Sequence, residues 1–139
     1  MPVVLDTSLL VAYANRQDRD HERARALMSS ILKGEHGTPL APDYVLDEGL
    51  TVLQARAGRA EHARTFASYL VPIDEEEPVV ELYQVDEPLV EAALELFFER
   101  FERGLSFTDA VVACLARRVE GSVAALEDDF EGIVATVGG

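Results

Sequence analysis

Short, uniformly apolar segments alternate with longer amphipathic segments along this sequence, and that alternation restricts the fold more than any other feature. The first apolar segment, residues 2–5, is ended by Asp6. Runs of Val and Leu this brief are typical of strands that are buried on both faces of a parallel sheet. Strands of that kind need helices over both faces, so the pattern predicts an α/β domain.

The remaining elements follow the same alternation. Apolar residues that recur with a period of about 3.6 predict helices, and brief apolar runs between them predict strands. We expect strands at residues 38–40, 78–85, 122–126 and 133–137, and helices at 18–33, from 42 or 43 to about 53, 60–70, 86–104 and 106–119. Asp86, followed by Pro88, is the predicted cap of the fourth helix,. The sequence thus predicts a three-layer α/β/α domain with a central, mainly parallel sheet of four to five short strands.

The length and the distribution of charge exclude several other classes of protein. At 139 residues, the chain suits one domain spanning residues 1–139,. No stretch without a charged residue exceeds nine positions, whereas crossing a bilayer takes roughly 20 apolar residues. A basic segment is missing from the N-terminus, so we expect no signal peptide, no membrane insertion and a cytoplasmic location. One cysteine and three scattered histidines disfavour a zinc site,. Any bound metal would have to be held by oxygen.

The chain is strongly acidic, with a formal net charge of −14, and Lys33 is its only lysine. Nucleic-acid-binding proteins ordinarily carry a basic patch, so this charge argues against a large surface that grips phosphates. Two explanations remain open. Either the partner is not a nucleic acid, or the acidic surface is an adaptation to high salt, where exposed charges are screened.

Four groups of acids occupy equivalent places in the predicted fold. Asp6 follows the first strand, Glu48 lies in the helix after the second, and Asp109 begins the helix after the third. Residues 127–129 follow the fourth strand. Sites in parallel sheets lie beyond the carboxyl ends of the strands, so these acids should meet at one edge. Clustered carboxylates raise one another's pKa and are stabilised by a cation, and ligands that are all oxygen favour Mg²⁺ or Mn²⁺.

Each acid also has a purely structural interpretation. Asp6 could cap a helix that begins at Thr7, and Asp109 could complete a capping box with Ser106,. Glu48 could be an exposed helical acid, and residues 127–129 could form a solvated turn. Asp47 is the alternative to Glu48, but it should point about 100° away around the helix.

Four motifs, taken in order, resemble one family over the whole length of the chain. They are VVLDTS at residues 3–8, DYVLDEGLTVL at 43–53, SFTDA at 106–110 and ALEDDF at 125–130. Together they resemble the PIN domain, and in particular the VapC-type toxin ribonucleases of bacterial and archaeal toxin–antitoxin pairs. The resemblance implies an endoribonuclease that depends on Mg²⁺ or Mn²⁺. Its implied catalytic and metal-binding residues are Asp6, Glu48, Asp109, Glu127 and Asp129.

The last motif departs from the family pattern Thr-x-Asp-x-Asp-Phe. With Phe130 as the anchor, Ala125 replaces the Thr and Glu127 replaces the first Asp, whereas Asp129 keeps the second. Either acid could be the fourth ligand, because Glu reaches about one methylene further than Asp. The resemblance also places Thr7 and Ser8 at small hydroxyl positions that would help to orient a metal-bound water.

The resemblance further implies which molecules this chain meets. They are a single-stranded or looped RNA substrate, a cognate antitoxin protein and a second copy of the chain in a homodimer. Several arginines are candidates for contacts with RNA phosphates: Arg16, Arg19, Arg56, Arg59 and Arg117.

Other functions compete with this hypothesis. A non-catalytic PIN-like protein-interaction domain is the main alternative, and the irregular Glu127 segment motivates it. A phosphoaspartate receiver domain would need an acidic pair after the first strand and a lysine near the last, which the sequence lacks. A phosphatase with an Asp-x-Asp pair is disfavoured because Ser8 occupies the second acidic position.

The acidic composition generates a first prediction. If the acidic surface serves salt tolerance, the free energy of unfolding should increase as KCl rises from tenths molar to molar, because screening relieves the repulsion among the surplus negative charges. Urea unfolding across a KCl series measures this. A protein that is most stable at low ionic strength would contradict the salt-tolerance interpretation.

Overall fold

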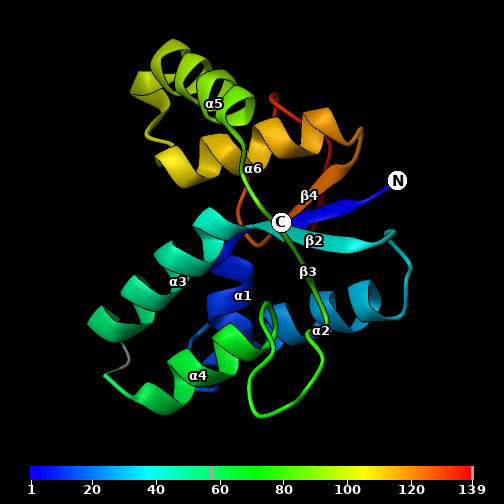
Figure 1. Ribbon diagram of the computed structural model, residues 1–139, viewed down its shortest axis with the longest axis vertical. Helices are drawn as coiled ribbons and strands as arrows, with labels where there is room; N and C mark the ends of the chain where they lie inside the picture. The colour runs from blue at the N-terminus through cyan, green and yellow to red at the C-terminus, as the bar shows by residue number, and fades with distance from the viewer. Residues whose placement is uncertain (57, 139) are drawn as a thin grey trace.

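Strand β1 (Val3–Leu5) is the centre of the sheet, and the other four strands are arranged around it (Figure 1). The computed structural model describes residues 1–56 and 58–138. The strand order is β3-β2-β1-β4-β5, with β2 at Pro39–Pro42, β3 at Glu81–Tyr83, β4 at Ser122–Ala125 and β5 at Thr136–Gly138. Every neighbouring pair is parallel. The predicted α/β class with a sheet of four to five short strands is confirmed.

Helices cover both faces of this sheet. They are α1 (Thr7–Ala14), α2 (His21–Leu32), α3 (Asp43–Arg56), α4 (Ala60–Ser68), α5 (Glu87–Glu99), the 3-10 turn η1 (Phe101–Arg103) and α6 (Phe107–Arg118). Helix α6 packs on β1, β2 and β4 with α5 outside it, whereas α1 packs on the opposite face beside α2, α3 and α4 (Figure 1). Each helix of the described residues is too short or too polar to span a bilayer.

The order in which the strands are connected creates a switch point beside β1. From β1 the chain runs outward to β2 and then to β3, and it next crosses back to β4 on the other side of β1. The carboxyl ends of β1 and β4 therefore lie side by side, and the Asp6 N–H donates a 3.0 Å hydrogen bond to the Ala124 carbonyl. In open α/β sheets, ligands bind at such a point.

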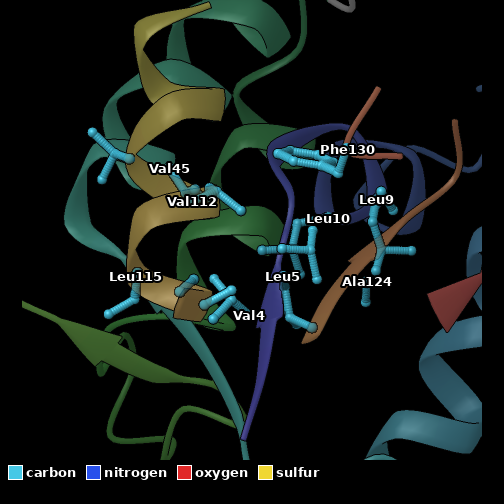
Figure 2. Close-up of a cluster of buried hydrophobic side chains, with 14 of the residues drawn as sticks. Val4, Leu5, Leu9, Leu10, Val45, Val112, Leu115, Ala124 and Phe130 are labelled. Atoms are coloured by element: carbon cyan, nitrogen blue, oxygen red, sulfur yellow. The ribbon is translucent and has the colours of Figure 1, made fainter. Parts of the chain in front are cut away.

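Buried hydrophobic side chains pack on both sides of β1 (Figure 2). Val4 and Leu5 of β1 have no exposed surface, and neither have Leu10 of α1 and Val112 of α6. Full burial of a side chain of this kind stabilises a fold by roughly 1.5–3 kcal/mol. The first strand is thus fixed from both faces and along both edges.

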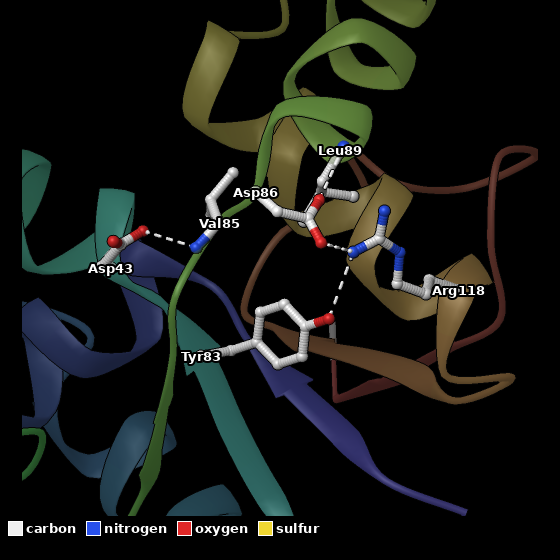
Figure 3. A network of polar contacts seen from close by, with 6 residues as sticks. All are labelled: Asp43, Tyr83, Val85, Asp86, Leu89 and Arg118. Atoms are coloured by element: carbon white, nitrogen blue, oxygen red, sulfur yellow. Dashed lines mark hydrogen bonds and ion pairs between the residues drawn. The ribbon is translucent and has the colours of Figure 1, made fainter.

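A polar network connects the outer helix layer to the edge of the sheet (Figure 3). Asp86 caps α5 as predicted, because its Oδ1 accepts a 2.9 Å hydrogen bond from the Leu89 N–H. Its Oδ2 accepts a 2.8 Å hydrogen bond from Arg118 at the end of α6, and this contact lowers the pKa of Asp86. Arg118 also donates to the hydroxyl of Tyr83 in β3. One side chain therefore joins α5, α6 and β3.

The structure corrects several predicted boundaries. The strand expected at 78–85 is limited to β3, because Pro78 lacks an N–H and the Val80 N–H donates instead to the Tyr69 carbonyl,. The strand expected at 133–137 begins at Thr136, since the N–H groups of residues 133 and 134 both donate to the carbonyl of Phe130. The first predicted helix starts later, at His21. The segment after Asp6 forms a separate helix, α1.

The helix expected at 86–104 is also interrupted. It ends at Glu99, and η1 follows before Gly104 takes a left-handed conformation with φ of 80°. The 3.6-residue period of the sequence places Phe98 and Phe101 in one apolar stripe of the expected helix, but they are 66% and 63% exposed,. That part of the prediction is wrong because Phe98, nine residues after the buried Leu89, lies on the opposite face of α5, and Phe101 lies beyond the end of that helix,.

The packing of α3 against α4 generates a test of the fold. A methyl group at Gly49 would overlap the ring of Phe66, which is fully buried and cannot move into solvent. We expect Gly49→Ala to lower the free energy of unfolding by roughly 1–3 kcal/mol, the usual cost of overpacking. Urea unfolding measures this, with Gln54→Ala on an exposed part of the same helix as the control. Equal stability of the two variants would contradict the packing described here.

Candidate active site

A cavity of about 640 Å³ opens at the carboxyl edge of the sheet, beside the switch point. Its walls come from the end of β1, the first turns of α1, the loop at 15–20, α3, α6 and the loop after β4. All five predicted site residues line it, together with two further acids: Asp6, Asp18, Asp20, Glu48, Asp109, Glu127 and Asp129. The expectation that the acidic groups meet at one edge of the sheet agrees with this arrangement.

Asp6 is the deepest of these acids, with only 5% of its surface exposed. Its backbone is fixed to β4, and its Oδ2 accepts a 2.6 Å hydrogen bond from the Ser8 hydroxyl. The side chain makes no capping hydrogen bond to α1, so the interpretation of Asp6 as a simple helix cap is wrong. Its Oδ1 is buried and has no hydrogen-bond partner among the described residues. Asp6 also lines the cavity, so a carboxyl group there has hydrogen-bonding capacity that the described residues leave unused.

The surroundings of Asp6 disfavour its charged form. Burial is the largest cause, and the negative charges of Asp109 and Glu48 act in the same direction. The hydrogen bond from Ser8 opposes them but is weaker, and the pKa of Asp6 rises from 3.8 to about 7. An acid held in this way needs either a proton or a nearby cation.

Asp109 has a structural role and a place in the cavity at the same time. Its Oδ2 accepts a hydrogen bond from the Ser106 N–H, and its own N–H donates to the Ser106 hydroxyl, both at 3.0 Å. The predicted capping box is therefore present, and it fixes the Asp109 carboxylate at the N-terminus of α6. Burial raises the pKa of Asp109 against the lowering effect of Ser106, and the charges of Glu48 and Asp129 raise it further.

Glu48 reaches the cavity from one face of α3. Val52 and Arg56, four and eight residues further on, line the same cavity, which marks that face of the helix,. Asp47 is exposed and does not contribute to the lining. The geometry thus selects Glu48 over Asp47, as the helical period predicts.

The loop after β4 brings both remaining candidates to the cavity. Glu127 and Asp129 are exposed and line it, whereas Asp128 does not. Only Asp129 is among the charges that raise the pKa of Asp109. The expected solvated turn and the expected site residues therefore occur in the same segment.

Two arginines that sequence reasoning missed hold this loop. Arg23 of α2 donates a 2.6 Å hydrogen bond to the Leu126 carbonyl. Arg103 of η1 donates to the carbonyls of Asp129 and Glu131, at 2.8 and 2.6 Å. No sequence pattern could have shown these contacts, because backbone carbonyls are present at every residue. The two arginines fix the loop from opposite ends.

The donors in the cavity suit a hard cation. Besides Asp6 Oδ1, the buried Thr7 Oγ1 lacks a hydrogen-bond partner in the described part of the chain, and Thr7 lines the cavity. The hydroxyl of Ser8, which was expected to help orient a metal-bound water, donates to Oδ2 of Asp6. Across residues 1–56 and 58–138, no three His, Cys, Asp or Glu side chains form an arrangement that could hold a metal on their own. Mg²⁺ usually keeps several waters and uses only one or two protein carboxylates together with substrate phosphates, so this open set of oxygens fits it.

The comparison with known families agrees with the fold and the motifs. A sequence model of the PIN domain matches residues 3–134. The chain belongs to the PIN domain family. The predicted family is therefore confirmed, and with it the three-layer α/β architecture.

This PIN domain is similar to two proteins named VapC and shares its fold with a toxin–antitoxin complex. A VapC ribonuclease of Archaeoglobus fulgidus is 25% identical over 131 residues, which cover 94% of this chain and 80% of that protein. VapC20 of Mycobacterium tuberculosis, a toxin that cleaves the Sarcin-Ricin loop, is 28% identical and superposes with a TM-score of 0.75 over 95% of this chain and 96% of its own. A toxin–antitoxin complex from Klebsiella pneumoniae contains a chain with the same fold, at 14% identity and a TM-score of 0.62 over 97% and 95% of the two chains.

The raised pKa of Asp6 predicts an unusual dependence of stability on pH in the metal-free PIN domain. Because the folded pKa, about 7, lies above the unfolded value of 3.8, the contribution of Asp6 to stability is fully present below pH 3.8 and is lost as the pH rises through 7,. Asp6→Asn removes this loss. The variant should therefore be more stable than the parent at pH 8, by roughly 4 kcal/mol for a shift of this size, and the difference should vanish near pH 4,.

Urea unfolding in EDTA at several pH values measures the difference. Asp47→Asn, at the exposed neighbour of Glu48, is the control and should show no such pH dependence. An Asp6→Asn variant that is less stable than the parent at pH 8 would contradict the described environment of Asp6.

Proposed function

We propose that this PIN domain is an endoribonuclease that depends on Mg²⁺ or Mn²⁺ and hydrolyses phosphodiester bonds of single-stranded or looped RNA. The observation that carries the proposal is the buried carboxylate of Asp6, which has one oxygen without a hydrogen-bond partner among the described residues and lines an acidic cavity at the switch point of the sheet. The VapC ribonuclease and the RNA-cleaving VapC20 among its relatives support the same activity.

The residues of the cavity would bind the cation, orient its ligands and activate the attacking water in such a reaction. Asp6 and Asp109 would hold the principal cation, and Ser8 and Ser106 keep these two carboxylates oriented through their hydrogen bonds. When bound, a divalent cation supplies a Lewis acid and lowers the pKa of a bound water. The carboxylate of Glu48 would orient the attacking water and accept its proton. Glu127 or Asp129, in the loop after β4, would complete the set of ligands.

We further propose that the chain is the toxin of a type II toxin–antitoxin system, acting in the cytoplasm. The VapC-type relatives and the toxin–antitoxin complex with the same fold support a cognate antitoxin as its partner. An antitoxin could inhibit the enzyme by offering a basic side chain to the carboxylates of the cavity. A homodimer is part of the same proposal.

One observation favours a second candidate function. Among the described residues, no three His, Cys, Asp or Glu side chains are arranged so that they could hold a metal ion. In addition, Glu127 replaces the first Asp of the family pattern. A PIN-like domain without a competent metal site would be a non-catalytic protein-interaction module. Metal-dependent cleavage separates the two candidates.

The proposal predicts the loss of activity in two variants. Asp6→Asn and Asp109→Asn each remove a charge next to the cation and keep the size of the side chain. We expect each to lower the rate of Mn²⁺-dependent cleavage by more than about 100-fold, since replacing a residue that merely supports a metal ligand already costs 10- to 100-fold. Cleavage of a panel of labelled hairpin and single-stranded RNAs measures this, with Asp47→Asn as the active control.

Thermal unfolding provides a second readout that does not require the right RNA. Millimolar Mn²⁺ should raise the melting temperature of the parent by mass action, and should do so much less in both Asn variants. Near-parental activity in either variant would rule out the assigned site. A parent with neither cleavage nor a Mn²⁺-induced shift would favour the interaction module.

A further inference from the structure

The acidic lining of the cavity would repel the RNA substrate that we propose for it. Seven carboxyl groups line it, and an RNA strand would bring a negative phosphate with every nucleotide,. One or two divalent cations could neutralise the acids nearest the cleaved bond, but the phosphates on either side of that bond would still face acidic walls. Some positive group of the chain must therefore lie in the path of the RNA.

Among the described residues, the basic side chains that line this cavity are Arg19 and Arg56. Other arginines that were candidates for phosphate contact lie elsewhere. Arg117 donates a hydrogen bond to the Ile133 carbonyl, Arg16 borders a hollow beside Tyr69, and Arg59 borders another next to Ala60. The structure therefore separates two of the five candidates from the rest.

Arg56 is at the end of α3, on the face that carries Glu48. The two residues are eight positions apart, so their Cα atoms are separated by about 12 Å along the helix axis. Arg56 is exposed and forms no ion pair with any of the described residues. Its guanidinium is thus available to a ligand that extends outward from Glu48.

Arg19 approaches the cavity from the loop between α1 and α2. This loop is held by its own hydrogen bonds, among them the Asp20 N–H to Asp18 Oδ1 at 2.8 Å. The side chain of Arg19 is nevertheless 91% exposed, and its one ion pair is a 3.8 Å approach to Asp20. Asp20 also faces Arg23 at 3.5 Å, so it is not dedicated to Arg19. A fixed backbone with a free guanidinium is suited to binding a phosphate.

We infer that Arg19 and Arg56 bind the RNA phosphates that flank the cleaved bond, one from the α1–α2 loop and one from the end of α3. The inference rests on the proposed ribonuclease function and adds how a strongly acidic chain holds its substrate. With two phosphate contacts, the slope of log affinity against log salt should be shallow, about −1.4 for a single strand. The arginines position the RNA and take no part in the proton transfers.

Neutral replacements test this inference in the 139-residue chain. Arg19→Gln and Arg56→Gln should each raise the KM for a cleavable loop RNA about tenfold, because each removes a hydrogen-bonded charge contact. The kcat should stay within about twofold, the pattern of a contact that binds substrate and transition state equally. Each variant should also flatten the salt dependence of kcat/KM by about 0.7. Arg64→Gln is the matched control, since Arg64 is exposed, pairs with Asp74 and lies outside the cavity lining.

The possible failures are distinguishable. If the parent cleaves RNA with Mn²⁺ but both variants match Arg64→Gln in KM and salt slope, the inference is overturned and the proposed function stands. If the variants lose kcat at constant KM, or lose the Mn²⁺-induced rise in melting temperature, the arginines act on the reaction or the metal site, and the inference is equally overturned. If the parent cleaves no RNA and is not stabilised by Mn²⁺, the proposed function fails and the inference fails with it.

Discussion

The burial of β1 on both faces and its pairing along both edges is the constraint on which the rest of the molecule depends. Because β2 and β4 are both parallel to β1, and α1 and α6 cover its two faces, the residue that follows β1 has almost no access to water. That residue is Asp6. The same packing that stabilises the sheet therefore places a carboxylate where ionisation is unfavourable, and the cost is offset only when a proton or a cation arrives. Under the proposed function, the metal-free fold is less stable at this position because Asp6 is placed to bind a cation.

The neighbouring acids are fixed by ordinary structural devices. A capping box holds Asp109, the helical period of α3 directs Glu48, and two arginines clamp the loop that carries Glu127 and Asp129. Each device satisfies local hydrogen bonds and at the same time points an acid into one cavity. The surplus of negative charge around Asp6 is consistent with cation binding, and it also means that a polyanionic substrate needs help from the few arginines nearby.

Most of the fold and the position of the candidate site could be predicted from the sequence, because both depend on local patterns. The brief apolar run before Asp6, the cap at Asp86 and the box at Ser106 each have a periodic or positional signal that survives in the structure. Other features depend on contacts that leave no such signal. The strand at 78–85 is shortened by a tertiary hydrogen bond of Val80, and Phe101 leaves the helical register because α5 ends at Glu99. The burial of Asp6, the missing partner of its Oδ1 and the clamp by Arg103 likewise became visible only in three dimensions.

Measuring the pKa of Asp6 is the most direct test of the central claim, which is that this buried carboxylate binds a cation. Carbon-13 NMR of its carboxyl group can follow the titration in the metal-free protein and again with saturating Mg²⁺. The account predicts a pKa of about 7 without metal and a fall well below that value when Mg²⁺ is bound,. An ordinary pKa near 3.8 in the metal-free protein, or a raised pKa that Mg²⁺ leaves unchanged, would contradict it.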